Sequence, residues 1–294
     1  MFLVPLTLDF LEQITANAVL LGFAYGMVGL GLSLVLGIMN VLNISHGTMY
    51  VLGGFLTFYA VSQLHYPPLV GFAFAAGITF VLGFVLQVGL ISRVSNDPAR
   101  VMLLTFGVAI ILGQISLLIW GGTAIPTPSI VKGYIVIGGV VDFQTELLLA
   151  ALVGIAVAIG TTIFLRSTKL GKAMRMVSQN SEAALSLGVN SKWIFAVALG
   201  IGSLYSGLAG SLLSPITFVY PDYQWFPLIY AFIVVIVGGL GSVIGSVVGG
   251  LIFGILETVG QVIFPSSSDV LVFLLIIVII LLRPRGLFGA KDRV

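Results

Sequence analysis

Long apolar runs, most of them close to twenty residues, alternate along this chain with short polar connections. About twenty helical residues cross the ~30 Å hydrocarbon core of a bilayer, whereas an outer-membrane barrel needs alternating segments of about ten. Only 7% of the residues are charged, against about 25% in soluble domains. Such a chain cannot cover a water-facing surface, so we expect an all-α polytopic membrane protein.

Eight or nine of these runs are expected to be transmembrane helices. They are residues 13–37, 41–64, 68–91, 101–120, 145–165, 193–214, 226–240, 243–264 and 269–282. The run 226–240 is short and ends in Gly-Gly-Leu-Gly, which favours a broken or re-entrant helix. No soluble domain or low-complexity tract interrupts the series, so residues 1–294 are expected to form a single transmembrane domain.

The charged residues between the runs separate by sign. Connections of one parity hold the basic residues Arg93, Arg100, Arg166, Lys169, Lys172, Arg175, Lys192, Arg283, Arg285, Lys291 and Arg293. The other connections hold Asp9, Glu12, Asp142, Glu146, Asp222 and Asp269, with Lys132 as their one basic residue. Because cytoplasmic loops are enriched in Lys and Arg, we predict an external N-terminus and a cytoplasmic C-terminus.

The longest external connection, residues 121–144, is rich in Gly, Pro and β-branched residues. That composition predicts an ordered loop or a small hairpin. Glycine is frequent throughout the chain, with 37 residues. The spacing of Gly241, Gly245 and Gly249 favours close helix packing, with a hinge or a backbone-lined cavity as the functional alternative.

The most polar part of the predicted interior lies at residues 39–54. Asn40, Asn43, Ser45 and His46 fall within seven residues and are followed by Gly47. Polar side chains in hydrocarbon must face protein or a water-filled cavity. A helix start capped by Ser45 is one interpretation, and a solute path lined by these residues is the other.

Two further features extend the candidate path. Thr105 and Gln114 lie nine residues apart in one run, and we expect them to point along similar directions, as a pore lining requires. Glu257 is the one acid well inside an apolar run. An ionisable residue there indicates a functional site, unless it reaches the nearby interface.

The chain contains few residues of the types that catalyse reactions or bind metals. The chain has two histidines and no cysteine, so we expect neither a catalytic group nor a metal site. The phosphate-binding pattern G-x-x-x-x-G-K-[ST] is missing from the sequence. The chain is therefore expected to be a non-enzymatic subunit that binds no ATP itself.

A short polar stretch, residues 177–190, interrupts the apolar runs after a basic segment. Asn180 or Ser181 can cap a short helix there, with Glu182 in its first turn. Ala183, Ala184 and Leu187 provide a small apolar surface, and Gly188 ends the helix in a left-handed conformation. A helix this short is unstable alone, so it needs a surface to pack on.

The pattern Glu182-Ala183-Ala184-x-x-x-Gly188 resembles the cytoplasmic loop of ABC-importer permeases, in which it forms a helix that docks on the ATPase subunit. Other stretches narrow the resemblance: NISHGTMYVLGGF, TFGVAIILGQ, SGLAG, VVIVGGLGSVIGSVVGGLIFGILE and LLRPRGLFG. Together, over roughly residues 20–290, they resemble permeases of branched-chain amino acid importers, especially the smaller, high-affinity "H" type.

The resemblance implies a subunit of an ATP-driven importer in a bacterial inner membrane. It implies a second permease subunit, two cytoplasmic subunits that bind ATP and Mg²⁺, and an external solute-binding protein, with no nucleic acid. Coupling would fall to Asn180, Ser181, Glu182, Ala183, Ala184, Leu187 and Gly188. Import of urea or short-chain amides by the same family, and an ion-coupled secondary carrier, remain the alternatives.

Overall fold

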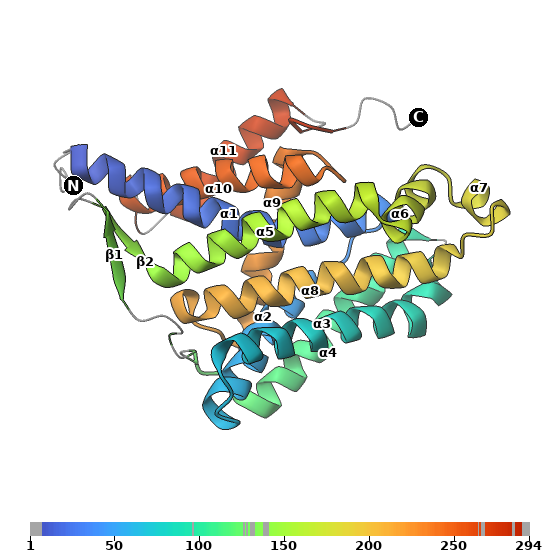
Figure 1. The fold of residues 1–294 in the computed structure, drawn as a ribbon, viewed down its shortest axis with the longest axis horizontal. Helices are drawn as coiled ribbons and strands as arrows, with labels where there is room; N and C mark the ends of the chain where they lie inside the picture. The colour runs from blue at the N-terminus through green and yellow to red at the C-terminus, as the bar shows by residue number, and fades with distance from the viewer. Residues whose placement is uncertain are drawn as a thin grey trace.

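The computed structural model describes residues 8–289 apart from 96, 126, 128, 130–132, 138–140, 264, 266, 267, 284 and 285. The described chain is helical except for one small hairpin (Figure 1). Its α-helices are α1 (Leu8–Met39), α2 (His46–Phe58), α3 (Pro68–Gly89), α4 (Pro98–Trp120), α5 (Thr145–Ser167), α6 (Lys169–Gln179), α7 (Ser181–Ser186), α8 (Ser191–Thr217), α9 (Trp225–Gly238), α10 (Val243–Ile263) and α11 (Ser268–Leu282). A π-helical turn (Tyr59–Gln63) and the 3₁₀ turns Ile91–Arg93 and Pro221–Gln224 complete the helical elements.

Seven of the described helical segments are long and apolar enough to cross a membrane. They are α1, α3 with the turn after it, α4, α5, α8, α9 with the turn before it, and α10. Helices α2 and α11 are shorter, at 13 and 15 residues. The predicted polytopic all-α class is confirmed, and every predicted run contains a helix. The start predicted at residue 41 is wrong, since helix α2 begins only at His46.

Helix α1 lies at the centre of the bundle and packs against α5, α8, α9 and α10 (Figure 1). In its most apolar stretch 83% of the residues are buried, against 28% in α3, α4 and α5. A helix that is apolar on all sides is expected to be enclosed by others. Helices α5, α8, α9 and α10 therefore enclose α1, whereas α3 packs on α8 and α2, and α4 packs on α2.

Glycines allow α1 and α10 to touch at the backbone. A Cβ atom on Gly250 would overlap the main chain of Gly22 and Gly26. Gly245 and Gly249 make the same kind of contact with the backbone of α9. The close helix packing predicted from the spacing of these glycines is therefore present in the structure.

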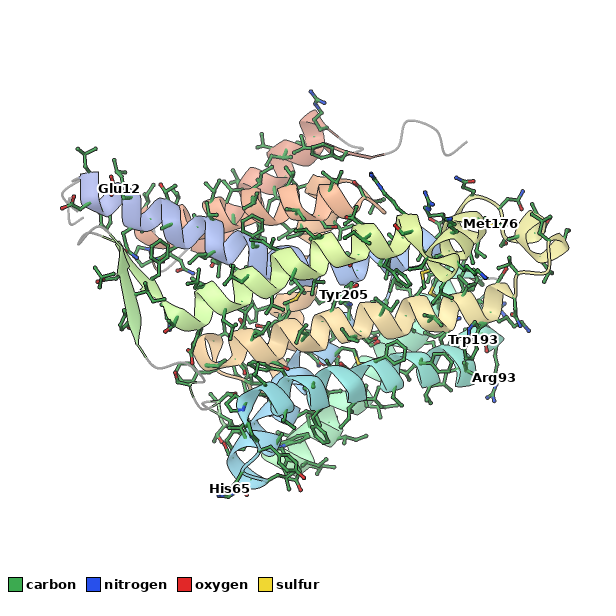
Figure 2. All side chains as sticks on the ribbon, in the orientation of Figure 1. Glu12, His65, Arg93, Met176, Trp193 and Tyr205 are labelled. Carbon is green, nitrogen blue, oxygen red and sulfur yellow. The ribbon has the colours of Figure 1, made fainter. Side chains whose placement is uncertain are left out.

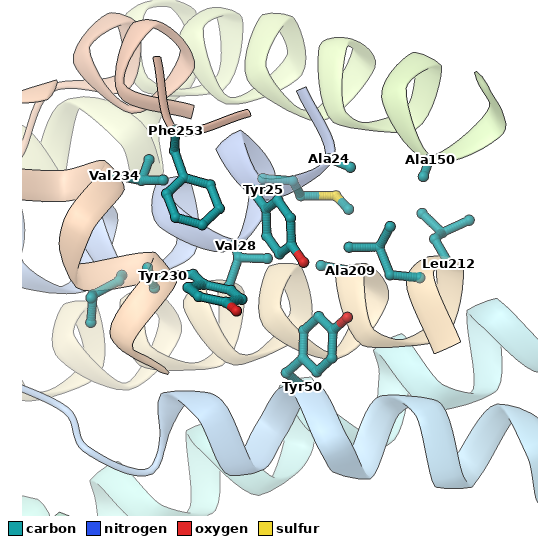
Figure 3. Close-up of a cluster of buried hydrophobic side chains, with 14 of the residues drawn as sticks. Ala24, Tyr25, Val28, Tyr50, Ala150, Ala209, Leu212, Tyr230, Val234 and Phe253 are labelled. Carbon is teal, nitrogen blue, oxygen red and sulfur yellow. The ribbon is translucent and has the colours of Figure 1, made fainter. Parts of the chain in front are cut away.

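Aromatic rings fill the space where α1, α9 and α10 meet (Figure 3). The ring of Tyr25 packs edge-on against Tyr230 and Phe253, with centroid separations of 5.3 and 5.1 Å. Tyr230 and Phe253 lie 4.8 Å apart. Offset and edge-to-face pairs of this kind add about 0.5–1.5 kcal/mol each beyond area burial. The cluster joins the C-terminal helices to the central one.

The two ends of the bundle differ in charge. Figure 2 shows Glu12 at one end of the long helices and Arg93, Met176 and Trp193 at the other. Helices α6 and α7 lie at the basic end, and the hairpin lies at the acidic end (Figure 1). The predicted separation by sign is therefore confirmed for these segments. Lys132, Arg285, Lys291 and Arg293 lie outside the described residues.

The predicted hairpin is confirmed in the connection 121–144. Strands β1 (Tyr134–Ile137) and β2 (Val141–Gln144) pair antiparallel, with Tyr134 opposite Gln144. Gln13 of α1 clasps β2 through both ends of its amide, which donates to the carbonyl of Asp142 at 2.8 Å and accepts from its N–H at 2.7 Å. This pair of bonds ties the hairpin to the first helix.

Candidate functional site

The polar stretch after α1 re-enters the bundle as non-helical chain. Asn40 ends α1 with a positive φ of 52°, a conformation that Asn tolerates better than most residues. Residues 40–45 have no regular structure, and α2 begins at His46. The His46 ring bonds the carbonyl of Val28, about 16 Å back along α1 from Met39 at 1.5 Å per residue. Helix α2 therefore starts near the middle of the bundle.

Side chains accept hydrogen bonds from backbone N–H groups in the non-helical residues 40–45. Asn43 Oδ1 accepts hydrogen bonds from the N–H of Ser45 at 3.1 Å and from its hydroxyl at 2.7 Å. The Ile44 N–H donates to Thr105 Oγ1 at 3.1 Å. Ser45 holds the N-cap position, as predicted, but its hydroxyl caps nothing because it is turned toward Asn43. Asn43 and Thr105 are the groups that make the break possible.

Helix α2 is held from the opposite side by α8 and α9. The Ser206 hydroxyl donates to the His46 carbonyl at 2.7 Å. The Thr48 hydroxyl donates to Gln224 Oε1 at 2.6 Å. A side chain on Gly47 would overlap the carbonyl of Gln224, so this position needs glycine. Two short helices, α2 and α9, thus begin against each other inside the protein.

The structure divides the predicted path residues into two groups. Asn43, Ser45, His46, Gly47 and Thr105 are buried, whereas Asn40 and Gln114 are exposed. The buried group organises the break in the helix.

The expectation that Thr105 and Gln114 point the same way is wrong. Nine residues make about two and a half turns of helix, which places them on opposite faces. Thr105 faces the Asn43 segment. Gln114 lies on the outer face of α4 among exposed aliphatic residues, including Ile110, Ile115 and Leu118.

The second candidate site is α7, a six-residue helix at the basic end of the bundle. Asn180 is its N-cap and accepts from the N–H groups of Glu182 and Ala183, both at 3.0 Å. Gly188 follows its end with φ of 82°. There the Gly188 N–H bonds the Leu185 carbonyl and the Val189 N–H bonds the Ala184 carbonyl, a Schellman motif. Both helix ends match the sequence prediction, with Asn180 rather than Ser181 as the cap.

One residue anchors α7 to the bundle. Ala184 is 2% exposed and belongs to an apolar cluster, here called the anchor cluster, which also contains Leu34 and Ile38 of α1, Met174 and Val177 of α6, and Ile194 and Ala198 of α8. The prediction that Ala183, Ala184 and Leu187 form one small apolar surface is therefore wrong, although the predicted need for a packing surface is met by Ala184. Helical rotation turns Ala184 inward while its neighbours face out.

The exposed face of α7 carries two large apolar side chains. Leu185 and Leu187 are 64% and 73% exposed, and Glu182 and Ala183 are exposed beside them. The sequence prediction of the site omits Leu185. No local sequence signal identifies it, because the exposure of Leu185 follows from the packing of Ala184 into the anchor cluster.

Helix α6 carries the basic segment beside α7. Its buried residues, Gly171, Met174 and Val177, recur at three-residue spacing on one face. Lys169, Lys172 and Arg175 are exposed on the other side. The helix is thus amphipathic, with its apolar side packed on the bundle and its positive side open.

Glu257 is 5% exposed and accepts a hydrogen bond from Gln261 Nε2 at 2.7 Å. The side chain is thus enclosed by neighbouring helices. The described residues contain no group of three or more His, Cys, Asp or Glu side chains that could hold a metal ion.

These features define a class: a multi-pass helical membrane protein with a helix broken at mid-depth and a capped surface helix at its basic end. Residues 14–281 match the sequence pattern of the family described as branched-chain amino acid transport system / permease component. The chain belongs to this family.

Curated relatives cover the chain almost end to end. The high-affinity branched-chain amino acid transport system permease protein BraD of Pseudomonas aeruginosa is 29% identical over 307 residues, or 98% of each chain. The corresponding protein LivH of Escherichia coli K12 is also 29% identical, over 97% of each chain. The permease protein LivM of Escherichia coli K12 is 24% identical over 78% of this chain and 59% of its own length. No solved structure matches the chain.

Proposed function

We propose that this chain is the smaller permease subunit of an ATP-driven importer of branched-chain or other hydrophobic amino acids. The full-length similarity to BraD and LivH supports this assignment. The exposed, doubly capped helix α7 is the single structural observation that carries it, because two exposed leucines on a six-residue helix call for a partner protein.

The partner on α7 is a subunit that binds ATP and Mg²⁺, and two such subunits serve a pair of permeases. This assignment places α6, α7 and the C-terminus in the cytoplasm and the N-terminus outside a bacterial inner membrane, in accord with the excess of Lys and Arg at that end. Motion of α7 would pass through Ala184 into the anchor cluster. Leu34 and Ile38 in that cluster belong to the last turns of α1, which lead into the non-helical residues 40–45.

The second permease subunit would complete the path against α4. An exposed Gln114 on an otherwise aliphatic face is unfavourable in lipid and favours a protein or water contact. The similarity to LivM, itself a high-affinity branched-chain amino acid transport system permease protein, supports two related permeases side by side. An external binding protein would deliver the amino acid to the acidic end.

The test is solute-stimulated ATP hydrolysis and uptake by the assembled transporter in vesicles. Replacing Glu182 with Lys and Leu187 with Asp should abolish stimulation while the chain still inserts. The matched control Lys192→Gln changes another exposed residue near α7 and should keep it. Uptake of leucine but not of urea or acetamide is expected. Uptake by the purified chain alone, driven by an ion gradient, would instead establish the secondary carrier.

A further inference from the structure

An open apolar groove runs along the outside of the bundle between α5 and α10. It has a volume of about 320 Å³. Ile155, Ile159 and Ile163 of α5 form one wall, and Ile244, Val247 and Val248 of α10 form the other. Phe23 of α1 lies at its floor. The groove is therefore a slot between two helices that both pack on the central one.

The end of the groove nearest α6 is cationic. Arg166 and Arg175 line a second space of about 280 Å³ together with Thr162 and Ser242. Thr162, Val243 and Ile244 line both spaces, so the two form one continuous site. Neither arginine has an ion-pair partner within the described part of the chain, and the described residues that line this space include no carboxylate.

The N-terminus of α10 adds to the positive potential at this end. Ser242 precedes the helix, and its hydroxyl accepts from the Gly245 N–H at 3.0 Å. The first residues of α10, Val243 and Ile244, line the cationic space. The helix dipole directs partial positive charge toward that space. Two guanidinium groups and a helix end therefore face the same small volume.

The length of the site matches one leaflet of a bilayer. Its lining on α5 extends from Ile155 to Arg166, about 16 Å along the axis at 1.5 Å per residue. Half of a ~30 Å hydrocarbon core is about 15 Å. An acyl chain in the apolar part would thus bring a lipid headgroup to the arginines.

We propose that this groove binds one anionic phospholipid of the leaflet next to α6. One acyl chain occupies the slot between α5 and α10, and the phosphate pairs with Arg166 and Arg175. Basic pockets between helices at the membrane surface recognise such headgroups. An apolar helix of a second subunit would fit less well, because it would cover two arginines that have no ion-pair partner among the described residues and would supply no counter-charge.

Native mass spectrometry of the full chain in mild detergent, titrated with phosphatidylglycerol or phosphatidylcholine, tests the proposal. Phosphatidylglycerol should bind more tightly. Arg166→Gln with Arg175→Gln should weaken its binding by roughly 30-fold, since each basic residue contributes about fivefold at an anionic surface. The matched control, Lys169→Gln with Lys172→Gln, removes two charges that are not among the residues lining either space and should weaken binding far less than the arginine pair. An equal loss of phosphatidylglycerol binding in both pairs would show that binding depends only on the total positive charge, and it would refute the proposed site.

Two further variants separate a bound lipid from misfolding and from a protein neighbour. Arg166→Lys with Arg175→Lys keeps the charge and should retain most of the binding, which shows that both positions tolerate substitution and that the Gln pair loses binding with its charge. A photo-crosslinking residue at Ile159 in intact membranes should yield a lipid adduct. An adduct with protein alone would assign the groove to a subunit interface and refute the proposal.

Discussion

The imidazole of His46 lies 3.0 Å from the carbonyl oxygen of Val28. Because a carbonyl only accepts, Nε2 carries the proton, and this bond fixes the first residue of α2 against the middle of α1. The polar residue that the sequence offers as a path lining therefore has a structural task. It sets the depth at which the broken helix begins.

Replacing His46 with Ala should destabilise the protein. The substitution removes this hydrogen bond and leaves a cavity at a fully buried position, for a cost of about 2–4 kcal/mol. The free energy of unfolding in a titration with SDS measures the effect. His46→Gln retains an N–H donor and should lose less. Equal stability of the Ala variant and the parent protein would contradict the role given to His46.

The bond between Thr48 and Gln224 should couple α2 to the start of α9. A double-mutant cycle with Thr48→Val and Gln224→Leu measures the interaction free energy between the two side chains. Interhelical hydrogen bonds in membranes average about 0.6 kcal/mol, with a maximum near 1.7, and the short 2.6 Å separation favours the upper part of this range. Additive losses in the two single variants would show that the bond transmits nothing between the helices.

The cap of α7 should control the opening of that helix alone. Asn180→Ala removes the acceptor for two backbone N–H groups, which costs about 1 kcal/mol. Amide hydrogen exchange in 181–186 should accelerate about fivefold, while the middle of α8 stays unchanged. Asn180→Asp keeps the acceptor and is the control. Faster exchange throughout α8 would instead show that the two helices open as one unit.

Much of this arrangement could be predicted from the sequence because its causes are local. Run length indicates the spanning helices, and Asn180 and Gly188 indicate the ends of α7. The sequence predicts the break before His46 only as a helix start near Ser45, because the break depends on Thr105, which is 61 positions away from Ile44 in the chain. A hydrogen bond between residues so far apart cannot be predicted from the neighbouring sequence.

The inward position of Ala184 has the same origin. Alanine and leucine on a short helix are equally compatible with either face, and only packing against Ile38 and Ile194 decides which one is buried. The groove beside Arg166 also depends on the distance between α5 and α10, which are far apart in sequence. The short helix α7 could therefore be located from the sequence, whereas the face that it buries required the structure.

Replacing Gly250 with alanine should destabilise the protein, whereas replacing Gly160 should not. Both lie within helices, but a Cβ on Gly250 meets the backbone of α1, and one on Gly160 meets nothing within 4 Å. Gly250→Ala should therefore cost about 1–3 kcal/mol through overpacking and lower the thermal midpoint in detergent by several degrees. Gly160→Ala is the matched control, because it adds the same methyl group with only a helix-propensity gain of about 1 kcal/mol or less. If both substitutions shifted the midpoint equally, close contact between α1 and α10 would not be the reason for this glycine.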